Sequence, residues 1–298
     1  MAETQVQALD FSETRPRTSE WKRFRRVFFA RGAVIGGLVI LALTFIMAIF
    51  APFIAPYDPY QPGVAESLAP PSAQHLLGAD LLGRDTLSRL IYGSRTALQV
   101  GFISVFASSV IGIILGIVAG YTRGFISGFI MRAVDALMCF PMLILSLVIA
   151  GLLGNGIWNV IIALSIATIP GYARIAYGLT LSIRENDYIL AQKSMGSGDW
   201  RTMLAHILPN AFPPLIVVVT MQLGSLILAE AGLSFLGIGI TPPGAAWGAM
   251  VNDGYKYLLN SPALSFAPGV AIMLVVFAFN IVGDGLRDAL DPRLRGLL

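Results

Sequence analysis

The chain has 298 residues, of which 56% are hydrophobic and only 12% are charged, and its net charge is +3. Soluble domains carry about 25% charged residues, so this chain has too few polar side chains to coat a globule, and its composition excludes a soluble protein. The small net charge argues against a nucleic-acid-binding surface. One cysteine and two histidines argue against a disulfide framework and a histidine-built metal site. We therefore interpret the sequence as an integral membrane protein.

Charge-free stretches predict six membrane-spanning helices, because a helix needs about 20 apolar residues to cross a bilayer. The first stretch follows a segment that contains several acidic residues, so we interpret it as a retained helix rather than a signal peptide. The third is too long for one helix and contains Gly154-Asn155-Gly156, a turn signal that divides it into two spans. In chain order the stretches are 32–57, 96–122, 136–173 (two spans), 211–237 and 265–283.

Lysine and arginine predict the side on which each loop lies. With the N-terminus inside, the inner segments hold 16 of the 20 Lys and Arg residues. The outer loops hold Arg84, Arg89, Arg95 and Lys256. Because positive residues are retained on the cytoplasmic side, we expect both termini in the cytoplasm.

These spans divide the chain into segments. We expect a basic cytoplasmic N-terminal segment (1–31), a first transmembrane helix (32–56), an external loop with an amphipathic helix (57–95), a five-helix core (96–291) and a cytoplasmic tail (292–298). Asp85 caps the amphipathic helix of the external loop, which we interpret as a lid on the outer rim. The basic N-terminal segment suits contact with anionic lipid.

A cytoplasmic loop at 184–210, within the core, carries two short amphipathic helices. The first, capped by Asn186 or Asp187, ends at Gly196, which suits the left-handed conformation that terminates helices. Its apolar face consists of Tyr188, Ala191 and Met195.

Asp199 can cap the second helix, and Pro209 blocks its continuation because proline lacks an N–H. Its apolar stripe consists of Trp200, Met203, Leu204 and Ile207. Helices of about eight residues are not stable alone in water, so these faces must lie on the membrane bundle or on another protein. The pattern alone fits equally well an amphipathic connector on the lipid surface.

The motifs of several enzyme classes are absent from the sequence. No GxxxxGK[ST] phosphate loop, CxxC or HExxH motif occurs, so we expect that the chain neither hydrolyses nucleotides nor acts as an enzyme. A hydrolase based on Ser234 or Cys139 is a remote alternative, because neither histidine lies in a predicted span.

Few charged residues lie in or beside predicted spans, and besides Arg174 and Asp284 they include three candidates for a transport path. Glu230 lies deep in the fifth span, and Arg132 and Asp135 lead into the third. Charge inside a membrane is costly, so such groups are functional or paired. One interpretation is that the three residues line or gate a transport path, and the other is that Glu230 pairs locally in a structural role. A carrier that works alone would use Glu230 as its ion or proton site.

The loop sequence ENDYILAQKSMGSGDWRTMLAHILPN resembles the EAA loop of bacterial ABC importer permeases. Ala191 holds the middle position of the Glu-Ala-Ala triplet, Gly196 the glycine, and Leu208-Pro209 the later Leu-Pro. Leu190 and Gln192 depart from the triplet, where the family usually has Glu and Ala. Three longer segments look like the C-type permease of dipeptide and oligopeptide importers, so the resemblance covers nearly the whole chain. They are HLLGADLLGRDTLSRLIYGSRTALQVG (75–101), AEAGLSFLGIGITPPGAAWGAM (229–250) and GDGLRDALDPR (283–293).

The resemblance implies an all-α integral membrane protein with six transmembrane helices and the type I ABC importer permease fold, in a bacterial inner membrane. It also implies a second permease, two ATPase subunits (or one fused) that bind ATP and Mg²⁺, and an external binding protein. By the same resemblance this chain itself holds no cofactor, metal or nucleic acid. The ligands are dipeptides or oligopeptides, with nickel chelates, glutathione or haem as alternatives. The residues that the resemblance implies for ATPase coupling are Asp187, Tyr188, Ala191, Gly196, Asp199, Trp200, Leu208 and Pro209. Arg132, Asp135 and Glu230 are candidates for a pathway or gate because of their charge, independently of the resemblance.

Overall fold

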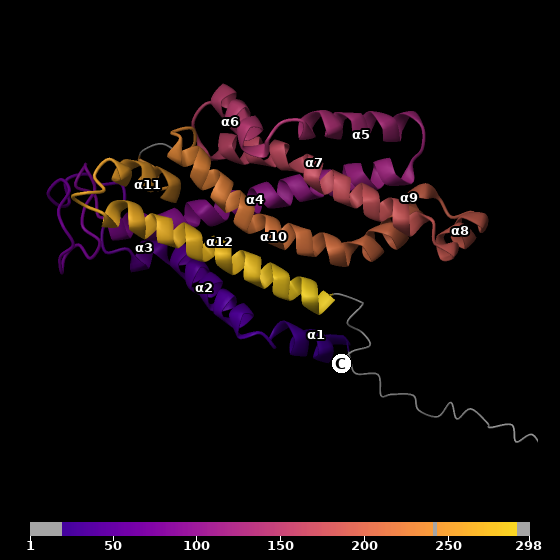
Figure 1. Cartoon of the computed structure of the whole chain (residues 1–298), viewed down its shortest axis with the longest axis horizontal. Helices are drawn as coiled ribbons and strands as arrows, with labels where there is room; N and C mark the ends of the chain where they lie inside the picture. Colours follow the sequence, from indigo (N-terminus) through magenta and orange to yellow (C-terminus); the bar gives the residue numbers. More distant parts are fainter. Residues whose placement is uncertain (1–19, 241–242, 291–298) are drawn as a thin grey trace, which may run out of the picture.

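The computed structural model describes residues 20–240 and 243–290, so the predicted tail (292–298) and most of the predicted N-terminal segment lie outside the described residues. Within these ranges every named element is helical and no β-strand forms (Figure 1). The first half contains α1 (Glu20–Phe28), α2 (Gly32–Ile49), α3 (Ala51–Ile54), α4 (Thr86–Tyr121), α5 (Phe125–Met138) and α6 (Met142–Leu153). The second half contains α7 (Ile157–Arg184), α8 (Asp187–Ser194), α9 (Asp199–Thr202), the π-helical turn η1 (Met203–Ile207), α10 (Leu208–Phe235), α11 (Trp247–Tyr255) and α12 (Ala263–Leu290).

Five helical stretches in the described residues are long and apolar enough to cross a membrane. They are α2, α4, α7, the continuous stretch Asp199–Phe235 and α12. A sixth span results if the bent pair α5 and α6 counts as one. The prediction of an all-helical protein with several membrane spans is therefore confirmed.

The predicted third span is not a straight helix. α5 and α6 meet at a bend of 90°, and Pro141 is the residue that precedes α6. Proline lacks the N–H that a continuous helix needs and disfavours helical geometry in the residue before it. α6 has 12 residues, which span about 18 Å at 1.5 Å per residue, so α6 alone cannot cross a bilayer. The predicted turn at Gly154-Asn155-Gly156 is confirmed, with positive φ angles at both glycines.

The amphipathic helix predicted within 57–95 does not end before the second span. α4 is a single helix of 36 residues. Asp85 caps it as predicted, because its carboxylate accepts a hydrogen bond of 2.7 Å from the backbone N–H of Ser88. No proline occurs between Thr86 and Tyr121, so the helix of the loop and the span form one rod.

α4 and α7 pack closely at the centre of the bundle because glycines on α4 face α7. A Cβ at Gly112 would lie 2.6 Å from the Cβ of Tyr172, and one at Gly116 would lie 2.6 Å from the Cβ of Ala176. Gly120 continues this row at the same spacing of four residues. Small residues allow two membrane helices to approach at backbone distance, so this row determines how closely α4 and α7 pack.

The two ends of the molecule carry different elements. Figure 1 shows α1, the last turns of α12 and the pair α8 and α9 toward one end, and α11 with the loop that precedes α4 at the other. An ion pair of 2.8 Å joins Arg31, before α2, to Asp288, near the end of α12. We call these the α8 end and the α11 end.

Candidate functional site

At the α8 end, α8 stops at Gly196, as the sequence predicts. Gly196 has a φ of +84°, its N–H donates to the carbonyl of Lys193, and the N–H of Ser197 donates to the carbonyl of Gln192. This pair of hydrogen bonds is the Schellman motif, which favours glycine at the left-handed position. Asn186 precedes α8, but its side-chain amide donates to the carbonyl of Ile183 rather than capping α8.

One side chain that the sequence pattern missed attaches α8 to the bundle. Ile189 is only 2% exposed, whereas the predicted apolar face of α8 is exposed. That face consists of Tyr188, Ala191 and Met195. The amphipathic pattern therefore identified the outward face of α8, and Ile189 is the one buried side chain of this helix.

Pro209 does not end the second helix, contrary to the sequence prediction. α9, η1 and α10 form one continuous helical stretch, in which Pro209 is near the start of α10. In the π-helical turn the N–H of Leu208 donates to the carbonyl of Met203, five residues back. This wider turn accommodates the hydrogen bond that Pro209 cannot donate, and the side-chain amide of Asn210 donates to the carbonyl of His206.

Half of the apolar stripe predicted for this helix is buried, and the other half is exposed. Met203 and Ile207 are buried against α4, α7 and α10 in a cluster with Ile117, Ala176, Ala211 and Leu215. Trp200 and Leu204 are exposed. Together with α8 they form what we call the outer apolar face, which consists of Tyr188, Leu190, Ala191, Met195, Trp200 and Leu204.

The last turn of α4 fixes both short helices. The hydroxyl of Tyr121 donates to Oδ1 of Asp199 at 2.6 Å, and the Nζ of Lys193 lies 5.3 Å from the centre of the Tyr121 ring. The predicted cap is therefore wrong: Asp199 binds Tyr121, and α9 has no side-chain cap. Arg184 donates from Nη1 to the carbonyl of Gly120 at 2.6 Å. Nothing in the sequence pattern singles out Tyr121, because its partners lie far along the chain.

The structure does not bring the three predicted pathway residues onto one surface. Arg132 is exposed on α5, and Asp135 forms a half-exposed ion pair with Arg174 of α7. Glu230 is 1% exposed inside the bundle, where its Oε1 accepts a hydrogen bond of 2.7 Å from the hydroxyl of Ser234. A residue that lines a path at the surface of this chain must be accessible there. In this conformation Glu230 is not, and its local pairing matches the structural interpretation.

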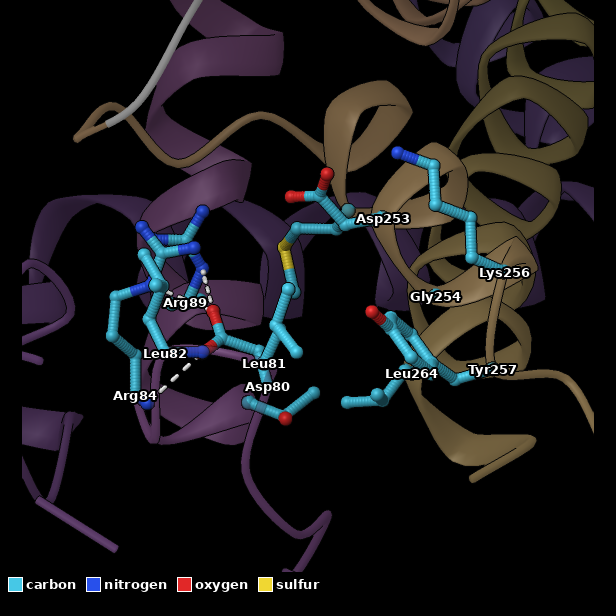
Figure 2. Close-up of a pocket in the computed structure, with 12 residues that line it drawn as sticks. Asp80, Leu81, Leu82, Arg84, Arg89, Asp253, Gly254, Lys256, Tyr257 and Leu264 are labelled. Atoms are coloured by element: carbon cyan, nitrogen blue, oxygen red, sulfur yellow. Dashed lines mark hydrogen bonds and ion pairs between the residues drawn. The ribbon is translucent and has the colours of Figure 1, made fainter. Parts of the chain in front are cut away.

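A cavity of about 220 Å³ lies at the α11 end (Figure 2). One wall comes from the loop before α4 and from its first turns, and it carries Asp80, Arg84, Thr86 and Arg89. The facing wall comes from α11 and the turn after it, and it carries Met250, Asp253, Lys256 and Tyr257. In the loop before α4, where the ring of Tyr60 packs against that of Tyr92, burial raises the pKa of the Tyr60 hydroxyl and Tyr92 raises it further. Among the described residues, no group of three or more His, Cys, Asp and Glu side chains could hold a metal ion.

Comparisons with known proteins agree with this architecture. The model of the family described as "Binding-protein-dependent transport system inner membrane component" matches residues 112–296, and that of the "N-terminal TM domain of oligopeptide transport permease C" matches residues 19–71. The chain is 43% identical over 277 residues to the glutathione transport system permease protein GsiD of Escherichia coli O157:H7, covering 93% of this chain and 90% of the relative. The same values hold for GsiD of Shigella sonnei (strain Ss046).

A solved structure supports the fold. A chain of the inward-facing MetNI methionine ABC transporter superimposes with a TM-score of 0.56 and 22% identity. The similarity covers 69% of this chain and 97% of that chain.

Proposed function

We propose a coupling mechanism from one premise: the chain belongs to the family of binding-protein-dependent transport system inner membrane components, as a permease of an ABC importer of the oligopeptide type. It is a multi-pass protein of the inner membrane. The mechanism concerns the α8 end, where the chain meets the subunits that supply energy.

The outer apolar face is the observation that carries the proposal. Helices as short as α8 and α9 need packing to be stable, and here Ile189, Met203 and Ile207 supply it on the inner side. The outward side chains include Trp200 and Met195, which are 68% and 78% exposed. An exposed apolar patch at the polar end of a helical bundle is typical of a protein-binding surface.

Two ATPase subunits, separate or fused, occupy the cytoplasmic side of the complex, and the one that docks on the outer apolar face binds ATP and Mg²⁺. This chain carries no phosphate loop, so hydrolysis belongs to those partners. A second permease completes the pathway, and an external binding protein delivers the ligand. The α8 end and both termini are then cytoplasmic, which agrees with the excess of Lys and Arg there.

The transported ligands are dipeptides or oligopeptides. The similarity to the glutathione permease GsiD favours glutathione, itself a tripeptide, as a second candidate. Uptake of radiolabelled dialanine and of radiolabelled glutathione by cells that express the complete transporter, each competed by the other compound unlabelled, separates the two. Glutathione uptake that unlabelled dialanine does not inhibit, with no uptake of dialanine, would select glutathione.

The test of the coupling mechanism is Trp200→Ala in the purified complex. Truncation of a central tryptophan in an interface costs about 2 kcal/mol or more, so the ATPase subunits should dissociate from the complex at concentrations where the wild type stays assembled. Leu152→Ala is the matched control, because Leu152 is a highly exposed apolar residue on α6. Unchanged assembly and transport in Trp200→Ala would contradict the docking role.

Uptake by this chain alone in liposomes, abolished by Glu230→Gln, would establish the ion-coupled carrier instead.

A further inference from the structure

Two buried arginines share one carboxylate at the wall of the α11-end cavity. Arg84 and Arg89 are 4% and 2% exposed. Oδ2 of Asp80 lies 2.6 Å from Nε of Arg84 and 3.5 Å from Nε of Arg89. Oδ1 of Asp80 accepts the backbone N–H groups of Leu82 and Arg84. The carboxylate of Asp80 is therefore fully engaged and has no further acceptor capacity to offer.

The donors of the two arginines are used very differently. Arg89 directs its terminal nitrogens at the backbone carbonyls of Pro59, Pro243 and Gly244. The side chain of Arg84 makes one hydrogen bond in the part of the chain that the structure describes, from Nε to Asp80. Arg84 lines the cavity, and no acceptor for its two terminal nitrogens occurs among residues 20–240 and 243–290.

A second donor beside Arg84 also lacks an acceptor. Thr86 lines the same cavity and is 1% exposed, and its hydroxyl oxygen is buried without a hydrogen-bond partner among the described residues. A buried hydroxyl without a partner costs about 1–3 kcal/mol, so a ligand that accepts its hydrogen bond gains that energy. Figure 2 shows Tyr257 on the facing wall, on the side of the cavity opposite Asp80 and Arg84.

The charges around the cavity favour an anion with a single charge. The lining holds the basic residues Arg84, Arg89 and Lys256 against the acidic residues Asp80 and Asp253, an excess of one positive charge. Asp253 is exposed and forms no ion pair within 4.0 Å among the described residues. Buried charge is costly unless it is paired and hydrogen-bonded, so a bound monovalent anion would complete this cluster.

We propose that this cavity binds the carboxylate group of a small ligand, which accepts hydrogen bonds from the terminal nitrogens of Arg84 and from the hydroxyl of Thr86. A carboxylate matches the planar guanidinium group in two parallel hydrogen bonds and carries the single charge that the lining lacks. A volume of about 220 Å³ suits a group of the size of an acetylated amino acid. The cavity lies at the opposite end of the molecule from the outer apolar face, so carboxylate binding can be tested independently of ATPase docking.

N-acetylglycine and its neutral amide, N-acetylglycinamide, test the proposal as a matched pair of probes. Saturation-transfer NMR on the full chain in lipid nanodiscs measures the dissociation constant of each. N-acetylglycine should bind, and the amide should bind at least about tenfold more weakly, because a hydrogen bond to a charged group contributes about 1.5–3 kcal/mol. Equal binding of the two probes, or no binding of N-acetylglycine, would overturn the proposal. Inorganic phosphate that binds more tightly than N-acetylglycine would overturn the choice of carboxylate.

Three variants locate the site. Thr86→Val replaces the hydroxyl by a methyl group of similar size and breaks no hydrogen bond of the described chain, so it should fold like the wild type and weaken N-acetylglycine binding about tenfold. Arg84→Gln should weaken N-acetylglycine binding at least as much. If loss of the ion pair with Asp80 unfolds the loop in that variant, Thr86→Val still tests the proposal. Arg95→Gln is the control, since Arg95 is exposed and stacks on Tyr92 outside the cavity. Wild-type binding in Thr86→Val, or an equal loss in Arg95→Gln, would place the ligand elsewhere.

Discussion

At the scale of single residues, Tyr121 is the point where the transmembrane bundle holds the loop that bears the outer apolar face. Its hydroxyl binds Asp199 at the start of α9, and its ring lies beneath Lys193 of α8. A force that a docked subunit exerts on α8 or α9 therefore reaches the last turn of α4 through this side chain, in addition to the buried contacts of Met203 and Ile207. Tyr121 is a positioning residue in this scheme, since it acts through the loop and not on a ligand.

Tyr121→Phe removes the hydrogen bond to Asp199 and keeps the ring under Lys193. We expect the complex to assemble, while the amount of peptide transported for each ATP hydrolysed falls several-fold. The ratio of uptake to ATPase activity in proteoliposomes measures this. Tyr177→Phe is the control, because Tyr177 packs on the cluster of α4, α5 and α7 away from the loop. A transport ratio equal to that of the wild type would show that the ring alone positions the loop.

Gly196 provides a second prediction at this scale. A non-glycine residue at a positive φ costs about 1–2 kcal/mol, and a β-branched side chain is the worst case, although nothing lies within 4 Å of a Cβ at Gly196. Gly196→Val should misplace α9 relative to α8 and uncouple ATP hydrolysis from uptake in an assembled complex. Gly196→Asn should retain most coupling, because asparagine tolerates this conformation. Gly198→Val, at a φ of −67°, is the backbone control, and coupling lost equally at both glycines would refute the explanation by left-handed geometry.

At the scale of elements, α4 joins the two functional ends of the molecule. Its first turns carry Arg89 and the cap at Asp85, and its last turn carries Tyr121. Because the helix is continuous over 36 residues, a displacement at one end is transmitted as a rigid-body movement rather than absorbed by a hinge. The glycine row on the face toward α7 keeps the two central helices at backbone distance.

Gly116→Leu should therefore separate α4 from α7. A Cβ at Gly116 already meets the Cβ of Ala176 at 2.6 Å, and overpacking of a tight interface costs about 1–3 kcal/mol. We expect a lower midpoint of thermal unfolding in detergent and a smaller yield of assembled complex. Gly171→Leu is the matched control on α7, where nothing lies within 4 Å of an added Cβ. Equal loss of stability in both variants would indicate a general effect of leucine rather than the close approach.

At the scale of the whole molecule, the number of spans rises from five to six when the bent pair α5 and α6 counts as one span. With six spans, the beginning of α2 and the end of α12 lie on the same side of the membrane, and Figure 1 shows α8 toward that end of the molecule. The ion pair between Arg31 and Asp288 ties the beginning of α2 to the end of α12. The α11 end, with the cavity and the loop before α4, then faces the opposite compartment. The proposed docking on the outer apolar face depends on this arrangement, since a docked ATPase must be cytoplasmic.

Thiol labelling checks the orientation. Cys139 is the chain's only cysteine and is exposed, so Cys139→Ser provides a background without cysteine, and Ser194→Cys and Asn260→Cys place one thiol at each end. A membrane-impermeant maleimide added to intact spheroplasts should label the Asn260→Cys chain and leave the Ser194→Cys chain unlabelled. Permeabilised spheroplasts should label both. Labelling of Ser194→Cys from outside would reverse the proposed orientation.

The sequence determined the features that depend on local chemistry. Long charge-free stretches predicted membrane helices, because in lipid the backbone N–H and C=O groups must form their hydrogen bonds within the helix. Gly196, Asp85 and the glycines at 154 and 156 marked helix ends correctly, because left-handed residues and caps act over a few neighbours. Helical spacing in the sequence also predicted five of the six residues of the outer apolar face, all except Leu190, but it did not separate them from the buried Met203 and Ile207.

The tertiary structure decided everything that depends on residues distant in the chain. Local rules made Pro209 a helix end and Asp199 a cap, but packing of Met203 and Ile207 kept the helix continuous through a π-helical turn, and Tyr121 took the carboxylate of Asp199. The sequence placed Glu230 in a span and Arg89 in an outer loop, yet both are buried: Glu230 accepts a hydrogen bond from Ser234, and Arg89 lines a cavity with Arg84 and Thr86. Which of these happens is set by the partners that the fold brings together, because the free energy of a buried charge depends on its neighbours in space and not on its neighbours in the chain.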